Sequence, residues 1–344
     1  MATPAIEVSA LFKTFGPRTG DAIARARENV DRATIQHETD TLVALRDINF
    51  SVAPGEIFML MGLSGSGKST LLRCINRLHE ISAGSVRIGT SDISTLDRAA
   101  LRELRRSHFG MVFQHFGLFP HRTVLENVGF GLELRGIPEA EREKEACTVL
   151  GKVGLADWAH RKTSELSGGM QQRVGLARAL AVDPKILLMD EPFSALDPLI
   201  RTELQEELRS LHQKLQKTIL FVTHDLNEAI RLGDRIAILG SEGQIVQIGT
   251  PEEILLNPAD DYVKKFLADV DRPAVIRVES VMDTRTNVHS NATSVRRSAT
   301  LKDVLGTLLT ATEPLPVIDE SAKRVGTLTL ERAAAFLTEV QSVH

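Results

Sequence analysis

Short, unbroken runs of apolar residues recur along this chain, separated by longer stretches with helical spacing. The runs Ile57–Met61, Ile186–Met189 and Ile219–Val222 contain no charged residue. Apolar runs of this length are typical of parallel strands that are buried on both faces of a sheet. Residues 122–160 have a helical pattern, and a further helix is expected over 198–217. Strands that alternate with helices predict an α/β fold.

Weaker patterns predict the elements around these strands. Residues 17–41 are polar and charged, and we expect them to form a surface insertion such as a short helical hairpin. Residues 6–12 alternate only loosely between apolar and polar positions, which indicates an edge strand. Further strands are expected at 45–52, 85–89 and 109–113, and a charged helix is expected at 97–106.

The first apolar run leads into a glycine-rich turn. The pattern Gly62-x-x-x-x-Gly67-Lys68-Ser69 follows the strand and precedes a helix that contains Leu71 and Leu72. Glycines let successive backbone N–H groups point at phosphate oxygens, a lysine adds positive charge, and a serine hydroxyl can ligate Mg²⁺. This context of strand, loop and helix predicts an ATP-binding loop. The residues expected to contact ATP are Gly62, Ser64, Gly65, Ser66, Gly67, Lys68, Ser69 and Thr70.

A pair of carboxylates follows the second apolar run. Asp190 and Glu191 come directly after Met189, at the predicted end of a strand. Beside a phosphate loop, the first acid is expected to hold Mg²⁺ together with Ser69. The second acid is then free to act as a general base toward water. In isolation, the pair could also be two surface acids.

Two other polar residues follow predicted strands. Gln114 comes after the strand at 109–113, and His224 comes after the run that ends at Thr223. Open α/β sheets place ligands at the carboxyl ends of their strands. Gln114 is therefore a candidate Mg²⁺ ligand that also touches the attacking water, and His224 is a candidate γ-phosphate contact. A solvated glutamine and a structural histidine are the plainer alternatives.

A second helix start suited to an anion lies about a hundred residues after the first. Ser167 is a good N-cap residue, and Gly168 and Gly169 follow it in the first turn. Two glycines weaken a helix locally, which makes sense where another group must approach the backbone closely. Upstream, the loop His115–His121 is unusually apolar and aromatic. It is either a contact surface or a loop folded onto its own domain.

Composition narrows the class of protein. A net charge of −4 over 344 residues, without a concentrated basic block, argues against nucleic acid as a partner. Cys74 and Cys147 are far apart in sequence, and we expect both to be reduced core thiols, which fits the cytosol. No apolar run approaches the roughly 18 residues that a membrane helix needs. Any work at a membrane is therefore expected to run through a partner.

Taken together, these motifs resemble the ATP-binding subunits of ABC transporters over about residues 5–270. The phosphate loop, Gln114, the signature at Leu166–Met170, the Asp190–Glu191 pair, Ser194–Asp197 and His224 occur in the family's order. The resemblance implies an ATPase cassette with a mixed sheet core and a helical subdomain at about 115–182. It also implies that Phe15, which by position alone could be a core residue, stacks on adenine. Two chains would pack head to tail, with Ser167, Gly168 and Gly169 of one closing on the ATP of the other.

A narrower resemblance points to the glycine betaine/proline importer ATPases, which act in osmoprotection. It rests on segments such as Phe193–Arg201 and Gly249–Ile254, and on the insertion after Phe15. It implies membrane-spanning permease partners, an indirect substrate-binding protein, and a peripheral position on the cytoplasmic face of the inner membrane. Choline and histidine importer subunits look similar. A DNA- or ribosome-acting ABC ATPase and a purely regulatory nucleotide binder are the alternatives from other classes.

The C-terminal residues 271–344 are expected to form a separate module. A helix from Ala299, strands at 315–319 and 325–329 and a helix from Leu330 resemble one CBS module of α+β type. Nucleotide-binding CBS modules usually place Asp three residues after the Ser/Thr of the last strand, where this chain has Arg332 after Thr329. A structural or dimerising appendage is therefore the alternative to a nucleotide sensor.

Overall fold

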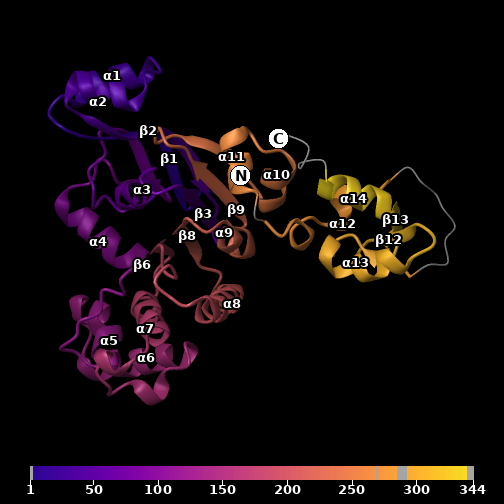
Figure 1. Cartoon of the computed structure of the whole chain (residues 1–344). Helices are drawn as coiled ribbons and strands as arrows, with labels where there is room; N and C mark the ends of the chain where they lie inside the picture. Colours follow the sequence, from indigo (N-terminus) through magenta and orange to yellow (C-terminus); the bar gives the residue numbers. More distant parts are fainter. Residues whose placement is uncertain (1–2, 269, 285–292, 339–344) are drawn as a thin grey trace. The chain divides into compact units, whose positions relative to one another are not determined.

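The computed structural model describes residues 3–268, 270–284 and 293–338 and divides the chain into two compact units, Met1–Ile248 and Gly249–His344 (Figure 1). The boundary at residue 270 expected from the resemblance remains a prediction.

A six-stranded sheet forms the centre of the first unit. The expected runs at 57–61, 186–189 and 219–222 are adjacent parallel strands in it, and the residues of all three are buried. This confirms the α/β prediction, because unbroken apolar strands need cover on both faces. The strand order is β10-β9-β3-β8-β7-β6. The strands are β3 Ile57–Gly62, β6 Phe109–Val112, β7 Ile186–Asp190, β8 Thr218–Thr223, β9 Arg235–Leu239 and β10 Ile245–Gly249.

A second, four-stranded sheet corrects one expectation. The strand β1 (Ile6–Phe15) is not at an edge, because it pairs with β2 (Leu42–Val52) on one side and β4 (Ala83–Ile88) on the other, in the order β2-β1-β4-β5. The short β5 is Ser91–Asp92. Register shifts in β1 interrupt its side-chain alternation, and that irregular pattern suggested an edge strand. Both sheets contribute to one core with helix α3 (Lys68–Ile75).

The insertion is a helical hairpin, as expected. It consists of α1 (Thr19–Arg27) and α2 (Arg32–Thr39), and Asp31 caps α2 by accepting a hydrogen bond from the Thr34 N–H (Figure 1). The hairpin has a small core of its own against β1 and β2. That core contains Phe12, Ala22, Ile23, Ala26, Ile35 and Val43.

Helices α5, α6 and α7 lie together in one part of the first unit (Figure 1). The stretch 122–160 is not wholly helical, because a turn around Gly136, with φ of 75°, separates α5 from α6. Cys74 is buried as expected, but Cys147 is exposed, because it lies outside the stripe of α6 that contains the buried Ala146, Val149 and Leu150. The helices are α4 Arg98–His108, α5 Val124–Leu134, α6 Glu139–Lys152, α7 Gly168–Ala181, α8 Pro198–Leu215 and α9 Leu226–Leu232, with 3₁₀ turns at Ala156–Trp158 and Thr163–Glu165.

The second unit has its own apolar core around a three-stranded sheet, β11-β12-β13. The predicted late helices and strands are present in it. Its elements are α10 Pro251–Leu256, α11 Asp261–Phe266, a 3₁₀ turn Arg272–Ala274, α12 Val278–Val281, β11 Val295–Arg296, α13 Leu301–Thr310, β12 Leu315–Ile318, β13 Arg324–Leu328 and α14 Leu330–Thr338. Within the described ranges of both units, every helix is too short or too polar to cross a bilayer.

Candidate functional site

The phosphate loop joins β3 to α3 through backbone shapes that only glycine adopts easily. Gly62 and Gly67 have φ of 155° and 101°. A Cβ atom at Gly62 would lie 2.6 Å from the Leu239 carbonyl oxygen, and one at Gly67 would lie 2.8 Å from the Ala44 carbonyl oxygen. Both contacts are with backbone and cannot relax cheaply. The spacing of the glycines therefore follows from the packing of this loop against β9 and β2.

Lys68 is held inside the loop. Its side chain is buried, and its Nζ donates hydrogen bonds to the carbonyl oxygens of Gly62 (2.8 Å) and Leu63 (3.0 Å). Burial lowers the pKa of Lys68, and the nearby carboxylates of Glu191 and Asp190 act in the opposite direction. The Ser66 hydroxyl is also buried and has no partner among the described residues. An orphaned donor beside a lysine in a backbone cradle fits a bound phosphate.

Two hard oxygen ligands meet beside this loop. Ser69 Oγ donates a hydrogen bond of 2.7 Å to Asp190 Oδ1, at the end of β7, and Arg73 Nη2 lies 3.7 Å from Asp190 Oδ2. A hydroxyl and a carboxylate, supplemented by water and phosphate oxygens, are a donor set that suits Mg²⁺. Gln114 lies two residues beyond β6 and is half-buried, but no contact of the described residues joins it to this pair.

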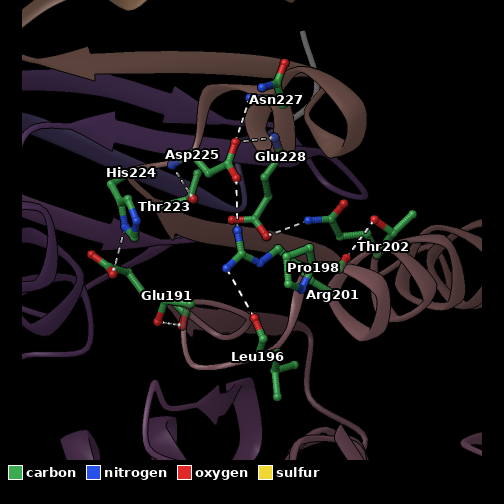
Figure 2. Close-up of polar contacts among 12 residues, drawn as sticks. Glu191, Leu196, Pro198, Arg201, Thr202, Thr223, His224, Asp225, Asn227 and Glu228 are labelled. Carbon is green, nitrogen blue, oxygen red and sulfur yellow. Dashed lines mark hydrogen bonds and ion pairs between the residues drawn. The ribbon is translucent and has the colours of Figure 1, made fainter.

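Glu191 and His224 form a pair at the ends of adjacent strands, as Figure 2 shows. The two side chains meet between Glu191 Oε2 and His224 Nδ1 at 3.0 Å. Glu191 has a left-handed backbone with φ of 46°, and its N–H donates to the Val222 carbonyl oxygen. A strained non-glycine residue at a strand end is typical of a functional site. The structure thus brings the predicted base and the predicted phosphate contact together.

Arg201 connects this pair to the turn after β7, and the sequence patterns did not single it out. Its Nη1 donates to Asp225 Oδ2 and its Nη2 donates to the Leu196 carbonyl oxygen, both at 3.3 Å (Figure 2). Ser194 Oγ donates to the Glu191 carbonyl oxygen at 3.0 Å. The contacts run from Glu191 through the turn and Arg201 to the residue after His224. An arginine in a helix gives no sequence signal for such a link.

The same view also contains a buried carboxyl group, that of Glu228 (Figure 2). Glu228 is 5% exposed, and its Oε1 accepts a hydrogen bond of 3.0 Å from Gln205 Nε2 of α8. Burial raises the pKa of Glu228 to about 7, and hydrogen bonds from Thr223 and Gln205 oppose that rise. Asp225 Oδ1 caps α9, because it accepts from the Asn227 and Glu228 N–H groups (Figure 2). Helix α8 is therefore joined to α9 and its N-cap by two polar contacts, Arg201–Asp225 and Gln205–Glu228.

The second helix start is arranged differently. Ser167 caps α7 as expected, with its Oγ 3.4 Å from the Met170 N–H nitrogen that donates to it. Ser167 and Gly168 are exposed. A Cβ atom at Gly169 would lie 2.6 Å from Ile200 Cγ2 of α8. Close packing of α8 is therefore one reason for a glycine here, and the anion contact remains a prediction.

Phe15 is not a core residue. It is 42% exposed at the end of β1, with Lys13 Nζ 4.5 Å from the centre of its ring and the His79 ring edge-on at 5.7 Å. An exposed aromatic ring is available for stacking, so the structure excludes the core alternative. Adenine stacking remains a prediction.

The loop His115–His121 is partly folded onto its own unit. The Phe119 ring packs against Phe130 at 4.6 Å, and the half-buried Arg178 of α7 donates to the carbonyl oxygens of Phe116 and Gly117. Burial lowers the pKa of Arg178. His115, Gly117, Pro120 and His121 are exposed. A groove of about 410 Å³ lies beside the loop, lined by His121, Arg122, Leu125, Glu126, Gly129, Glu133, Glu139, Arg142 and Glu143.

The fold and the site together define an ATPase cassette of the ABC type. The family model described as ABC transporter matches residues 45–194. A solved ATP-binding cassette, a dimer in a post-hydrolysis state bound to ADP and Pi, is 34% identical with a TM-score of 0.60, over 72% of this chain and 98% of that one.

Curated relatives narrow the group. The glycine betaine transport ATP-binding protein of Bacillus subtilis is 52% identical over 80% of this chain and 66% of its own length, slightly less than two thirds. The trimethylamine N-oxide transport system ATP-binding protein of Pelagibacter ubique is 44% identical over 95% of this chain and 96% of its own length. The chain therefore belongs to the ABC transporter family, among the ATP-binding subunits of glycine betaine/proline betaine and related amine transporters.

Proposed function

We propose that this chain hydrolyses ATP to drive import of glycine betaine, proline or a related quaternary amine. One observation of the structure carries the enzymatic part: the Glu191–His224 pair lies at strand ends that adjoin the loop holding Lys68. The names of the relatives support the solute class. Choline or histidine import by the same type of subunit is the alternative.

The residues have distinct roles in the proposed reaction. Lys68 and the backbone amides of Gly65 and Gly67 bind the phosphates, as the donors of a glycine-rich loop before a helix commonly do. Ser69 and Asp190 hold Mg²⁺, which neutralises charge that develops on the phosphate oxygens. The two other groups, Glu191 as general base and His224 as γ-phosphate contact, are held 3.0 Å apart. The full proposed set also includes Phe15, Gly62, Ser64, Ser66, Thr70, Gln114, Ser167, Gly168 and Gly169.

Two copies of the chain are proposed to act together, head to tail. The exposed start of α7 supports this arrangement, since Ser167 and Gly168 leave a helix N-terminus open to an anion. The related cassette solved as a dimer bound to ADP and Pi also supports it. Each ATP would lie between the phosphate loop of one chain and the Ser167–Gly169 segment of the other.

The membrane partner is proposed to be a permease subunit that contacts the loop His115–His121. The groove beside this loop and its exposed residues support the proposal. The chain then works as a peripheral subunit on the cytoplasmic face of the membrane, and a substrate-binding protein acts only through the permease.

The C-terminal residues 271–344 are proposed to be a single CBS-like module that stabilises dimers. Arg332 occupies the place where nucleotide-binding modules usually have an aspartate. Its Nε donates to the Val281 carbonyl oxygen at 2.5 Å, and its N–H donates to Thr329 Oγ1 at 3.2 Å. A cation engaged with backbone supports a structural role for this position.

The test is to purify the chain with its permease subunits, reconstitute them in vesicles and measure ATP hydrolysis with single solutes. Glycine betaine, proline betaine, proline, trimethylamine N-oxide, choline and histidine are compared. We expect a betaine to stimulate hydrolysis most, and the Glu191→Gln complex to show no stimulation. Stimulation by histidine alone would replace the proposed solute, and hydrolysis unaffected by every solute would contradict import.

A further inference from the structure

The helical insertion reaches the phosphate loop through one side chain. Arg32, the first residue of α2, directs its Nη1 to the carbonyl oxygen of Gly65 at 3.3 Å and to that of Ser241 at 3.1 Å. Gly65 lies inside the phosphate-loop motif. None of the roles proposed above uses the insertion, so this contact is the link between the hairpin and the nucleotide site.

Arg32 is held from several sides. Its backbone N–H donates to Glu242 Oε2 at 2.8 Å, and the preceding Asp31 caps α2. The Arg46 guanidinium donates to the Val30 carbonyl oxygen, which ties the connection between the two helices to β2. The guanidinium of Arg32 is thus fixed by the fold of the hairpin rather than free on the surface.

The peptide that Arg32 contacts has little other support. Gly65 has φ of 81°, and no heavy atom lies within 4 Å of the position that its Cβ would take. The Gly65–Ser66 peptide is held at its carbonyl end by Arg32 and at its N–H end by the Leu63 carbonyl oxygen, at 3.2 Å. The direction of the peptide N–H groups decides how a phosphate is bound in such a loop.

We propose that Arg32 is a positioning residue, through which the insertion fixes the Gly65–Ser66 peptide and raises the affinity for ATP. This inference rests on the proposed ATP-binding role of the loop. The positive charge of the guanidinium also favours an anion nearby, although salt screens this contribution. We expect Arg32 to change ATP affinity and not the rate of hydrolysis. Its hydrogen-bond partners are Glu242, Gly65 and Ser241, and neither Glu191 nor His224 is among them.

The test compares the full-length chain with Arg32→Met, Arg32→Lys and Arg25→Ala. The first variant keeps the apolar stem and loses the donors, and the second keeps a charge but not the fork. Arg25 is the matched control, because it lies in the same hairpin and pairs only with Glu38 and Glu28 among its recorded contacts. ATP affinity is measured by titration calorimetry, steady-state hydrolysis gives kcat and KM, and the thermal midpoint reports folding.

We expect Arg32→Met to weaken ATP binding about five- to tenfold with kcat within about twofold of the parent, which corresponds to the net contribution of one typical hydrogen bond. Arg32→Lys should recover part of the affinity, and Arg25→Ala should match the parent. Unchanged affinity in Arg32→Met would overturn the proposal. So would an equal loss in Arg25→Ala, since that reports the stability of the hairpin alone. A parent chain that binds ATP without hydrolysing it would instead contradict the proposed function, while the affinity comparison would still test Arg32.

Discussion

The starts of α3 and α7 are both helix N-termini with glycines suited to an anion, but they differ in their exposure and in their contacts with the rest of the chain. At α3, Lys68 is buried and bonded to two carbonyl oxygens, and Ser69 is bonded to Asp190. At α7, Ser167 is exposed and caps its own helix, Ile200 packs against Gly169, and Leu196 lies close to Gly168. The first site is organised by its own chain, whereas the second is presented outward.

The first turn of α8 lies against the start of α7 and also contacts Asp225, the residue after His224. Ile200 contacts the position of Gly169, and the next residue, Arg201, bonds to Asp225 beside His224. A shift of α7 against α8 would therefore move Arg201 and, through Asp225, displace the Glu191–His224 pair. The comparison teaches that an outward-facing helix start can still be linked through packed side chains to the proposed catalytic residues of its own chain.

The largest effect is expected from the site that the chain organises by itself. Glu191→Gln removes the proposed base but leaves Lys68 and Ser69 in place. Hydrolysis should fall about 10²- to 10⁴-fold, the usual range for loss of general-base catalysis, while ATP affinity stays near the parent value. Steady-state phosphate release and ATP titration measure the two quantities. The exposed Glu206→Gln on α8 is the control, and parent-like turnover in Glu191→Gln would remove the role of this residue.

The outward-facing site should matter only when two chains meet. Ser167→Arg and Ser167→Ala both lose the N-cap, at a cost of about 0.5–2 kcal/mol, but only the arginine adds bulk and charge toward a partner. We expect ATP binding by the monomer to be kept in both variants. The concentration-dependent ATPase rate should fall at least about tenfold more in Ser167→Arg than in Ser167→Ala, because the long arginine side chain sterically blocks closure on the partner chain. Equal ATPase rates in Ser167→Arg and Ser167→Ala would contradict the proposed role of the α7 start in the contact between two chains.

The joint between the sites can be tested through Gly169 and Ile200. Gly169→Ala places a methyl group 2.6 Å from the Ile200 Cγ2 position, so it should destabilise the fold by about 1–3 kcal/mol, as overpacking usually does. Ile200→Ala opens space, and the double variant should recover most of that loss in a denaturant titration. If the two changes in the free energy of unfolding simply add, Gly169 of α7 and Ile200 of α8 are not in packing contact.

The smallest expected effect concerns the buried carboxyl group of Glu228. Burial raises the pKa of Glu228 to about 7 from its ordinary 4.5, so the folded state binds more protons than the unfolded state between these values. Its protonated form stabilises the fold fully below pH 4.5, and that contribution is lost as the pH rises through about 7. Glu228→Gln stays neutral, so its stability relative to the parent should increase by about 1–3 kcal/mol between pH 5 and pH 8.

Denaturant unfolding at the two pH values measures this difference. The exposed Glu206→Gln should show no such trend. A relative stability of Glu228→Gln that does not change with pH would show that the carboxylate is accommodated in its charged form, through Thr223, Gln205 and Arg201.

Sequence by itself determined the chemistry of each motif and the strands that present it. The run before Gly62, the spacing to Lys68 and Ser69, and the acids after Met189 are local patterns, because chain geometry fixes where neighbours in sequence go. The helical hairpin at 17–41 and the burial of the apolar strands were predicted for the same reason. The prediction that β1 is an edge strand was wrong, because its loose alternation comes from bulges that depend on pairing with both β2 and β4.

Only the tertiary structure decided which ordinary residues reach the site. Arg32, Arg201 and Glu228 sit in helices where charged residues are common, and no local pattern distinguishes them from solvated neighbours. Their partners lie 33, 24 and 23 positions away. The close packing of Gly169 likewise depends on Ile200, which follows only after the rest of α7, the strand β7 and a turn. Such contacts form when separate elements pack together, and a single sequence records the residues without recording which of them the packing will join.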